Sequence, residues 1–157
     1  MPTSSEATND SSLEARTPGA KRAGPGEHLF DMHKVNRIMG GPAYSPVFGS
    51  CVEGDRMIVA LMRYPKGEPS EAHSHPNEQW IFILEGEMDM EFDGKWIRGK
   101  PGDVFYVPAG KIHKAANNGE KDVVFFTCKD AVHGLHGTKA GLHDTKAGSH
   151  GARHAGS

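Results

Sequence analysis

Short apolar runs, separated by turns that contain glycine or proline, dominate the central part of the chain. The longest of them, residues 57–64, ends at a Pro-Lys-Gly turn and indicates a buried strand. Residues 87–92 alternate strictly between acidic and apolar side chains, which is typical of a strand with one buried face. Asp93 and Gly94 follow, the pair that a tight hairpin prefers, so a return strand is predicted over residues 95–98.

Three more apolar runs extend the predicted core, at residues 80–84, 104–107 and 123–128. Residues 27–50 carry scattered apolar side chains ahead of a Gly-Gly-Pro sequence, which predicts a short strand or edge segment followed by a turn. The total is about nine strands, with no helix in the core. The predicted fold class is therefore all-β.

The two ends of the chain differ in composition from its centre. Residues 1–26 are dominated by Ser, Thr, Glu, Ala, Gly and Pro, and they offer too little apolar surface to order themselves, so we expect a disordered arm. Residues 131–157 contain a near-repeat, in which residues 134–140 resemble residues 141–147. Each copy carries glycine and only one leucine, which predicts a flexible Gly/His-rich tail rather than a coiled coil. The folded domain is expected over residues 27–130.

Length and charge exclude several classes of function. A chain of 157 residues suffices for one ordinary domain, so we expect one core and one site. Its 18 basic and 20 acidic residues give a formal net charge of -2, which leaves no basic face for nucleic acid or for a membrane surface. No apolar stretch approaches the roughly 20 residues of a membrane span. With no apolar secretory signal near the start, a cytoplasmic protein is expected.

Three of the ten histidines form a pattern that suggests chemistry: His73, His75 and His113. His73 and His75 are two positions apart, so on a strand both imidazoles face the same side and can grip one ion. Gln79 begins the next apolar run, and its amide oxygen is a serviceable neutral ligand. Five other histidines lie in the glycine-rich tail, where closing the chain around an ion costs much entropy, so only weak, adventitious metal binding is expected there.

Two motifs around these residues resemble the signatures of the cupin superfamily. The first, over residues 67–86, consists of Gly67, His73-Ser-His75, Gln79 and Gly86, with glutamine where glutamate is usual. The second, over residues 102–117, consists of Gly102, Pro108-Ala-Gly110, His113 and Asn117, and it matches without departure. The resemblance implies a small, single-domain, metal-binding cupin: an RmlC-like jelly-roll β-barrel of two antiparallel sheets.

The same resemblance implies one divalent transition metal per chain, held by His73, His75, Gln79 and His113. Because Gln79 is neutral, the ion would keep its full charge, which makes bound water more acidic and attracts anionic substrates. Iron is the favoured metal, while nickel, zinc, manganese and copper stay open.

Strand parity with His73 and His75 sends Met88, Met90 and Phe92 inward, where they either line an apolar pocket or simply fill the core. A pocket of this kind favours an aromatic or other apolar substrate over a sugar. Four strand residues are able to orient an anion or a carbonyl, although parity does not fix their faces: Arg56, Arg63, Tyr64 and Tyr106. No catalytic residue is assigned.

Several functions agree with this site. Three histidines without a carboxylate resemble the ligands of several cupin dioxygenases, so we favour an Fe(II) dioxygenase of a small carbonyl or aromatic compound. The first motif also resembles cupins that linearise unsaturated uronates, but the acidic residue that those enzymes need falls near Phe126. A redox-neutral isomerase, cyclase or lyase using Zn, Ni or Mn stays open, as does a non-catalytic ligand-binding or sensory cupin. The resemblance also implies a homodimer, with residues 27–50 supplying the contact.

Overall fold

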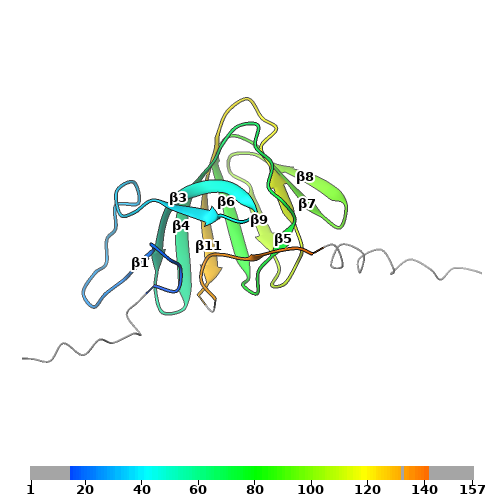
Figure 1. Ribbon diagram of the computed structural model, residues 1–157. Helices are drawn as coiled ribbons and strands as arrows, with labels where there is room; N and C mark the ends of the chain where they lie inside the picture. The colour runs from blue at the N-terminus through cyan, green and yellow to red at the C-terminus, as the bar shows by residue number, and fades with distance from the viewer. Residues whose placement is uncertain (1–14, 132, 142–157) are drawn as a thin grey trace, which may run out of the picture.

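The computed structural model describes residues 15–131 and 133–141, and every regular element within them is a β-strand (Figure 1). The all-β prediction is confirmed in this part of the chain, which contains no helix able to span a membrane. The strands are β1 (Lys21–Arg22), β2 (Ile38–Gly41), β3 (Ser45–Glu53), β4 (Met57–Tyr64), β5 (His73–Ser74), β6 (Gln79–Glu85), β7 (Met88–Phe92), β8 (Lys95–Gly99), β9 (Val104–Val107), β10 (Lys114–Ala116), β11 (Val123–Asp130) and β12 (Thr138–Lys139).

The largest sheet has the strand order β1-β3-β4-β11-β6-β9, and β2 pairs with β3 off this path. Its pairings are antiparallel, except that β1 runs parallel to β3. β11 lies between β4 and β6, in the interior of the sheet (Figure 1). Alternate residues of β11 therefore point either into the core or out to solvent.

Two smaller sheets complete the described structure, with the orders β10-β7-β8 and β12-β5. The expected pair of antiparallel sheets is thus only part of the architecture, because three sheets form and their ladders do not close into a continuous barrel. The third sheet was not expected, because β12 lies in a segment whose glycine-rich composition predicted a flexible tail. An isolated bridge between His73 and His113 connects β5 to the residue just before β10.

Most of the predicted strands are present. β4 and β9 have the predicted bounds, and β6, β7, β8 and β11 differ from theirs by one or two residues at an end. Residues 27–50 contain β2 and then a turn into β3, which extends well beyond the expected short strand. β3 was underestimated because serine and glycine interrupt its apolar residues, and β5 and β10 were missed because they are short.

The predicted hairpin between β7 and β8 turns at Asp93 and Gly94. Their φ angles are 51° and 80°, both in the left-handed region that a type I′ turn requires. Glycine adopts this region without steric cost, and aspartate tolerates it better than most residues. The Asp-Gly pair therefore fixes the register in which β8 returns along β7.

The core lies between the two larger sheets. Met88 and Met90 of β7 belong to the same buried cluster as Ile58, Ile81 and Phe125 of the seven-stranded sheet. The alternate residues of β6 and β9 point outward, and there the rings of Trp80 and Tyr106 lie 4.6 Å apart between centroids.

Both ends of the described chain, which lie outside the expected domain of residues 27–130, contact the rest of the structure. The backbone N–H groups of Arg16 and Thr17 donate to the buried Glu53 carboxylate at 2.6 and 2.8 Å. The Thr17 hydroxyl accepts a hydrogen bond from the Leu135 N–H at 2.7 Å, which joins the two ends. These contacts are mainly polar and made by the backbone, so apolar patterning did not reveal them. The predictions for residues 1–14, 132 and 142–157 lie outside the described residues.

Candidate metal centre

Three histidines from the two sequence motifs meet at one end of the core. The ring centroids of His73 and His113 are 4.3 Å apart, those of His75 and His113 are 5.1 Å apart, and those of His73 and His75 are 6.3 Å apart. The backbones of His73 and His113 exchange two N–H···O=C bonds of 2.9 and 3.0 Å. These two hydrogen bonds hold the first motif against the second.

Each of the three rings is oriented by its own backbone. The Nδ1 atoms lie 2.8 to 2.9 Å from a carbonyl oxygen two residues away along the chain: Glu71 for His73, Asn77 for His75 and Lys111 for His113. A carbonyl oxygen only accepts, so Nδ1 carries the proton and Nε2 keeps its lone pair. This is the tautomer that a metal-ligating histidine needs. The Nε2 atom of His75 is buried and has no hydrogen-bond partner.

Burial also keeps the imidazoles neutral. Desolvation is the main cause that lowers the pKa of His73 to about 3 and the pKa of His75 to about 4, and it lowers the pKa of His113 as well. The charge of Lys129 acts in the same direction on all three rings. Neutral imidazoles coordinate a cation without first losing a proton.

Gln79 is held by a hydrogen-bond chain through Thr127. The Thr127 hydroxyl donates its single proton to the carbonyl of Trp80 at 2.8 Å, so it must accept from the Gln79 amide NH₂, also at 2.8 Å. This chain settles which end of the amide is nitrogen. The oxygen Oε1 is therefore the end of Gln79 that is left for another partner.

The donor set suits a divalent transition metal. It supplies three imidazole lone pairs and an amide oxygen, and one of the lone pairs, on Nε2 of His75, is buried without a hydrogen-bond partner. Within residues 15–131 and 133–141, however, no three His, Cys, Asp or Glu side chains stand as a finished metal cluster. The rings would have to close further around an ion, so the ligand assignment stays a prediction.

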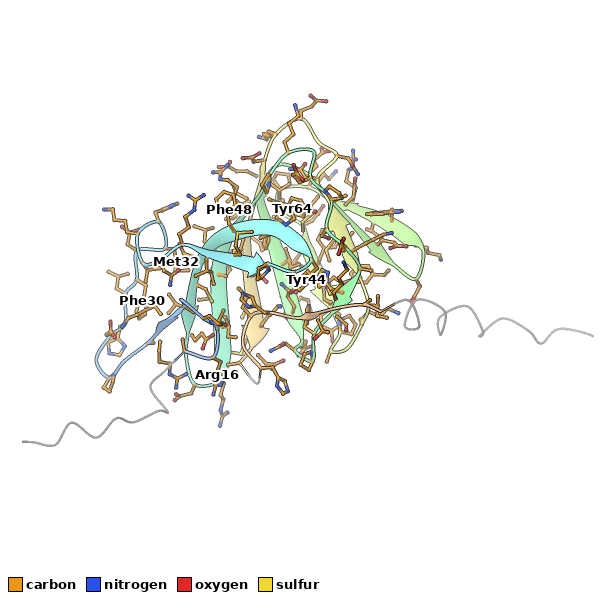
Figure 2. All side chains as sticks on the ribbon, viewed as in Figure 1. Arg16, Phe30, Met32, Tyr44, Phe48 and Tyr64 are labelled. Carbon is orange, nitrogen blue, oxygen red and sulfur yellow. The ribbon has the colours of Figure 1, made fainter. Side chains whose placement is uncertain are left out.

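Tyr44 is a neighbour of this site that the sequence did not reveal. Its ring stacks on His73, and its hydroxyl accepts a hydrogen bond from the Gly137 N–H at 2.7 Å. Figure 2 shows Tyr44 close to the C-terminal segment, whereas Phe30 and Met32 lie on the far side of β3. The C-terminal segment thus covers the histidines, because Lys139 of β12 also pairs with His73 of β5.

A cavity of about 80 Å³ opens beside the histidines. Its wall is largely apolar and includes Met88 and Met90, whereas Phe92 does not line it and instead lies 6.0 Å from the His113 ring. The polar side chains that reach the cavity are Tyr44, Ser45, Tyr64, Ser70, His73, Gln79, His113, Thr127 and Lys129. His75 is buried and does not line the cavity. The cavity has room for a ligand of only a few heavy atoms.

Lys129 is a further cavity residue that sequence reasoning missed. It shares the inward parity of Val123, Phe125 and Thr127 on β11, and all four are buried. A lysine in phase with the apolar face of a strand was the signal that could have identified it. Phe126, where the uronate-linearising cupins place an acid, points outward and is 37% exposed. No acidic side chain of β11 lines this cavity.

Of the four residues proposed to orient a substrate, only Tyr64 reaches the cavity. Tyr64 is buried, and its hydroxyl donates to the Ala115 carbonyl at 3.0 Å. Arg63 points outward to Asp122, and Tyr106 packs on Trp80. Arg56 is exposed as well.

Both cysteines are free thiols, and neither is suited to be a nucleophile. Cys51 is fully buried, and desolvation raises its pKa to about 12. Cys128 is half-buried, and desolvation raises its pKa too. A thiolate is the reactive form, so the raised pKa values disfavour both thiols as nucleophiles at neutral pH.

Comparisons with known proteins agree with the fold and the motifs. A family model described as "Cupin domain" matches residues 60–128, which include both motif histidine groups. The RmlC-like cupin from Shewanella frigidimarina superposes with a TM-score of 0.56 at 20% identity, covering 68% of this chain and 92% of that one. The superposition supports the jelly-roll architecture, and residues 60–128 are similar to the cupin domain family.

Two curated relatives carry names that indicate function. Quercetin 2,3-dioxygenase of Bacillus subtilis is 28% identical over 101 residues, which cover 64% of this chain and 28% of that protein. The oxalate-binding protein of Thermotoga maritima is 35% identical over 69 residues, which cover 43% of this chain and 57% of that protein. The chain therefore matches a quarter to just over half of the length of these relatives, which leaves its own activity to be proposed from the site.

Proposed function

We propose that this cupin domain is a metal-dependent enzyme that acts on a small organic substrate at a divalent ion bound by His73, His75, Gln79 and His113. The observation that carries the proposal is the common arrangement of the three imidazoles. Each donates Nδ1–H to a backbone carbonyl and keeps Nε2 unprotonated, beside a cavity with an apolar wall.

The surrounding residues prepare the site for such chemistry. Thr127 fixes the amide of Gln79, and Tyr44 fixes the plane of His73. The methionines of β7 and Ile81 give the cavity an apolar wall, which lowers the local dielectric and strengthens electrostatic interactions beside it. A bound ion would supply Lewis acidity and, if it is iron, one-electron chemistry for a reaction with oxygen.

An Fe(II) dioxygenase of a small carbonyl or aromatic compound is the first candidate. The nitrogen-rich donor set without a carboxylate favours iron, nickel, copper or zinc over manganese. A relative named as a dioxygenase supports oxygen chemistry in this superfamily. The cavity of about 80 Å³ restricts the substrate to a compact molecule.

Two other candidates have observations of their own. A redox-neutral isomerase, cyclase or lyase is favoured by the neutral Gln79, because an ion with four neutral ligands is a strong Lewis acid. A non-catalytic binding protein is favoured by the relative named for oxalate binding. Both use the same four ligands, so they differ from the dioxygenase in turnover rather than in geometry.

Elemental analysis of tag-free protein, together with an oxygen-electrode assay, separates these candidates. The assay panel contains small diketones, phenols and hydroxy acids. Near-stoichiometric iron with substrate-dependent oxygen uptake supports the dioxygenase, whereas zinc or nickel without oxygen uptake supports the redox-neutral enzyme. Protein that binds no metal after purification or reconstitution contradicts the metalloenzyme and leaves a binding protein.

The ligand assignment has its own test. His75→Ala and His113→Ala should each reduce metal affinity by more than the roughly 10- to 100-fold that loss of an outer-shell partner costs. The matched control is a chain that ends at residue 141, because it removes His143, His150 and His154 and keeps β12. If the truncation lowers metal content as much as the histidine substitutions do, the assigned site is wrong.

Assembly and location are also proposals. We propose a homodimer that uses residues 27–50, and analytical ultracentrifugation of the full chain should give twice the 17.0 kDa mass. A sedimenting monomer at micromolar concentration contradicts it. Cell fractionation tests the proposed cytoplasmic location.

A further inference from the structure

Lys129 places a buried amine inside the candidate metal centre. The residue is 4% exposed and lines the same cavity as His73, Gln79 and His113. On β11 it lies opposite Gln79 of β6 in the antiparallel register. Desolvation by burial lowers the pKa of this amine to about 7.

The Lys129 amine forms no ion pair within the described residues, although the charge of Asp130, the next residue along β11, raises its pKa slightly against the effect of burial. One of its N–H donors is used, by the Leu135 carbonyl at 2.6 Å. The buried carboxylate of Glu53 is already occupied by the backbone N–H groups of Arg16 and Thr17. A desolvated ammonium is costly, which is why burial lowers the pKa of Lys129, and an anion that enters the cavity would stabilise its protonated form.

We propose that the Lys129 ammonium binds the carboxylate of the substrate, which makes the substrate a small organic acid with a second oxygen, such as a 2-oxo or 2-hydroxy acid. The carboxylate would lie on Lys129 and the second oxygen would face the histidines. This inference rests on the proposed metal site, because the histidines and Gln79 would hold the ion that receives the second oxygen. It replaces the purely apolar or aromatic substrate that the methionines of β7 had suggested.

Charge and size both agree with this substrate class. Four neutral ligands would leave the full charge on the ion, and Lys129, when protonated by a bound acid, would add another positive charge to a cavity with an apolar wall. In such a medium the attraction for an anion is several times stronger than in water. A cavity of about 80 Å³ accepts an acid of a few carbon atoms.

A second role for Lys129 must be separated from this one. Its bond to Leu135 fastens the C-terminal segment, so replacing Lys129 lowers stability whether or not it binds substrate. Stability alone is therefore uninformative. The discriminating readout is a change in binding that depends on the charge of the ligand.

Calorimetric titration of the full chain loaded with Zn(II), a redox-inert ion, provides that readout. The probes are pyruvate and its neutral amide, pyruvamide, which have nearly the same size. Lys129→Met should weaken pyruvate binding by roughly ten- to a hundredfold, the range for a hydrogen bond to a charged group. Pyruvamide binding should be unchanged, Lys129→Arg should retain part of the preference for the acid, and Zn(II) affinity should not fall. Lys95→Met, at an exposed position of β8, is the matched control.

The outcomes separate the two claims. If Zn(II) binds but Lys129→Met retains the wild-type preference for pyruvate over pyruvamide, the role of Lys129 is overturned while the metal site stands. If Zn(II) does not bind and pyruvate binding still depends on Lys129, the metal site is overturned while the anion contact stands. Should Lys129→Met fail to fold, Lys129→Gln takes its place, because its amide keeps a donor for Leu135 and removes the charge.

Discussion

The ring of Tyr44 lies on the imidazole of His73, with centroids 3.9 Å apart and planes inclined by 19°. Tyr44 comes from the turn between β2 and β3, and its carbonyl accepts a hydrogen bond from the Glu71 N–H at 2.7 Å. Its hydroxyl also accepts the N–H of Gly137. One residue therefore connects the start of the large sheet, a candidate metal ligand and the C-terminal segment.

Two substitutions at Tyr44 should separate these contacts. Tyr44→Phe removes only the hydrogen bond to Gly137 and should cost about 1 kcal/mol of unfolding free energy. Tyr44→Ala also removes the ring and should cost about 3–5 kcal/mol, the range for deleting a buried aromatic side chain. Because the ring fixes the plane of His73, metal affinity should fall in Tyr44→Ala and stay near wild type in Tyr44→Phe. Denaturant unfolding and Zn(II) titration measure both effects, and equal metal affinity in the two variants contradicts the role of the ring.

Gln79→Glu should change which metal the site prefers. The substitution restores a carboxylate where the cupin motif usually has one, and carboxylates favour Mn(II) more than amides do. The affinity for Mn(II) relative to Zn(II) should therefore rise in this variant, as measured by competition titration. Thr127→Val is the control that disturbs the amide of Gln79 without adding charge. An unchanged ratio of the two affinities would show that Gln79 does not ligate the ion.

Periodicity and turn chemistry were sufficient for the strands that carry the core. β4 and β9 were predictable to the residue because apolar side chains dominate them and turns bound them. The Asp93-Gly94 hairpin was predictable because its turn type requires those residues. The candidate ligands could be named because they occupy the spacing of the two motifs. Spacing alone does not give the distances between their rings.

Contacts between distant, mainly polar segments could not be predicted in the same way. The bonds of Glu53 to Arg16 and Thr17, and that of Lys129 to Leu135, join parts of the chain that no local pattern relates. Each depends on the tertiary fold bringing a buried charge beside free backbone groups. For this reason the ordered structure extends into both segments that composition had assigned to an arm and a tail.

Stability of the metal-free protein should fall as the pH is lowered through the range of the histidines. In the unfolded chain a histidine gains its proton near pH 6.5, whereas burial lowers the pKa of His73 to about 3 and that of His75 to about 4. Between these values the unfolded state binds more protons, so the free energy of unfolding should fall by about 1.4 kcal/mol per pH unit for each histidine.

Urea unfolding in the presence of EDTA at pH 7, 6 and 5 measures this dependence. The control is the double variant His73→Gln/His75→Gln, which should lose most of the slope. Asp89 does not interfere, because its ion pair with Arg98 lowers its pKa and moves its titration below this window. A wild-type protein whose stability is constant from pH 7 to pH 5 contradicts the burial of the two imidazoles.

Glu53 should be the residue that secures the N-terminal segment. It is fully buried, and its two oxygens accept the N–H groups of Arg16 and Thr17. Glu53→Gln turns one acceptor into a donor, so one backbone N–H loses its partner at a cost of about 1–3 kcal/mol. Asp55→Asn, at an exposed carboxylate that pairs with Arg22, should change stability by less than about 0.5 kcal/mol. Hydrogen exchange should speed up at residues 16, 17 and 135 in Glu53→Gln alone, since Thr17 also holds Leu135. Unaltered exchange at these three amides would mean that the segment is held by something other than this carboxylate.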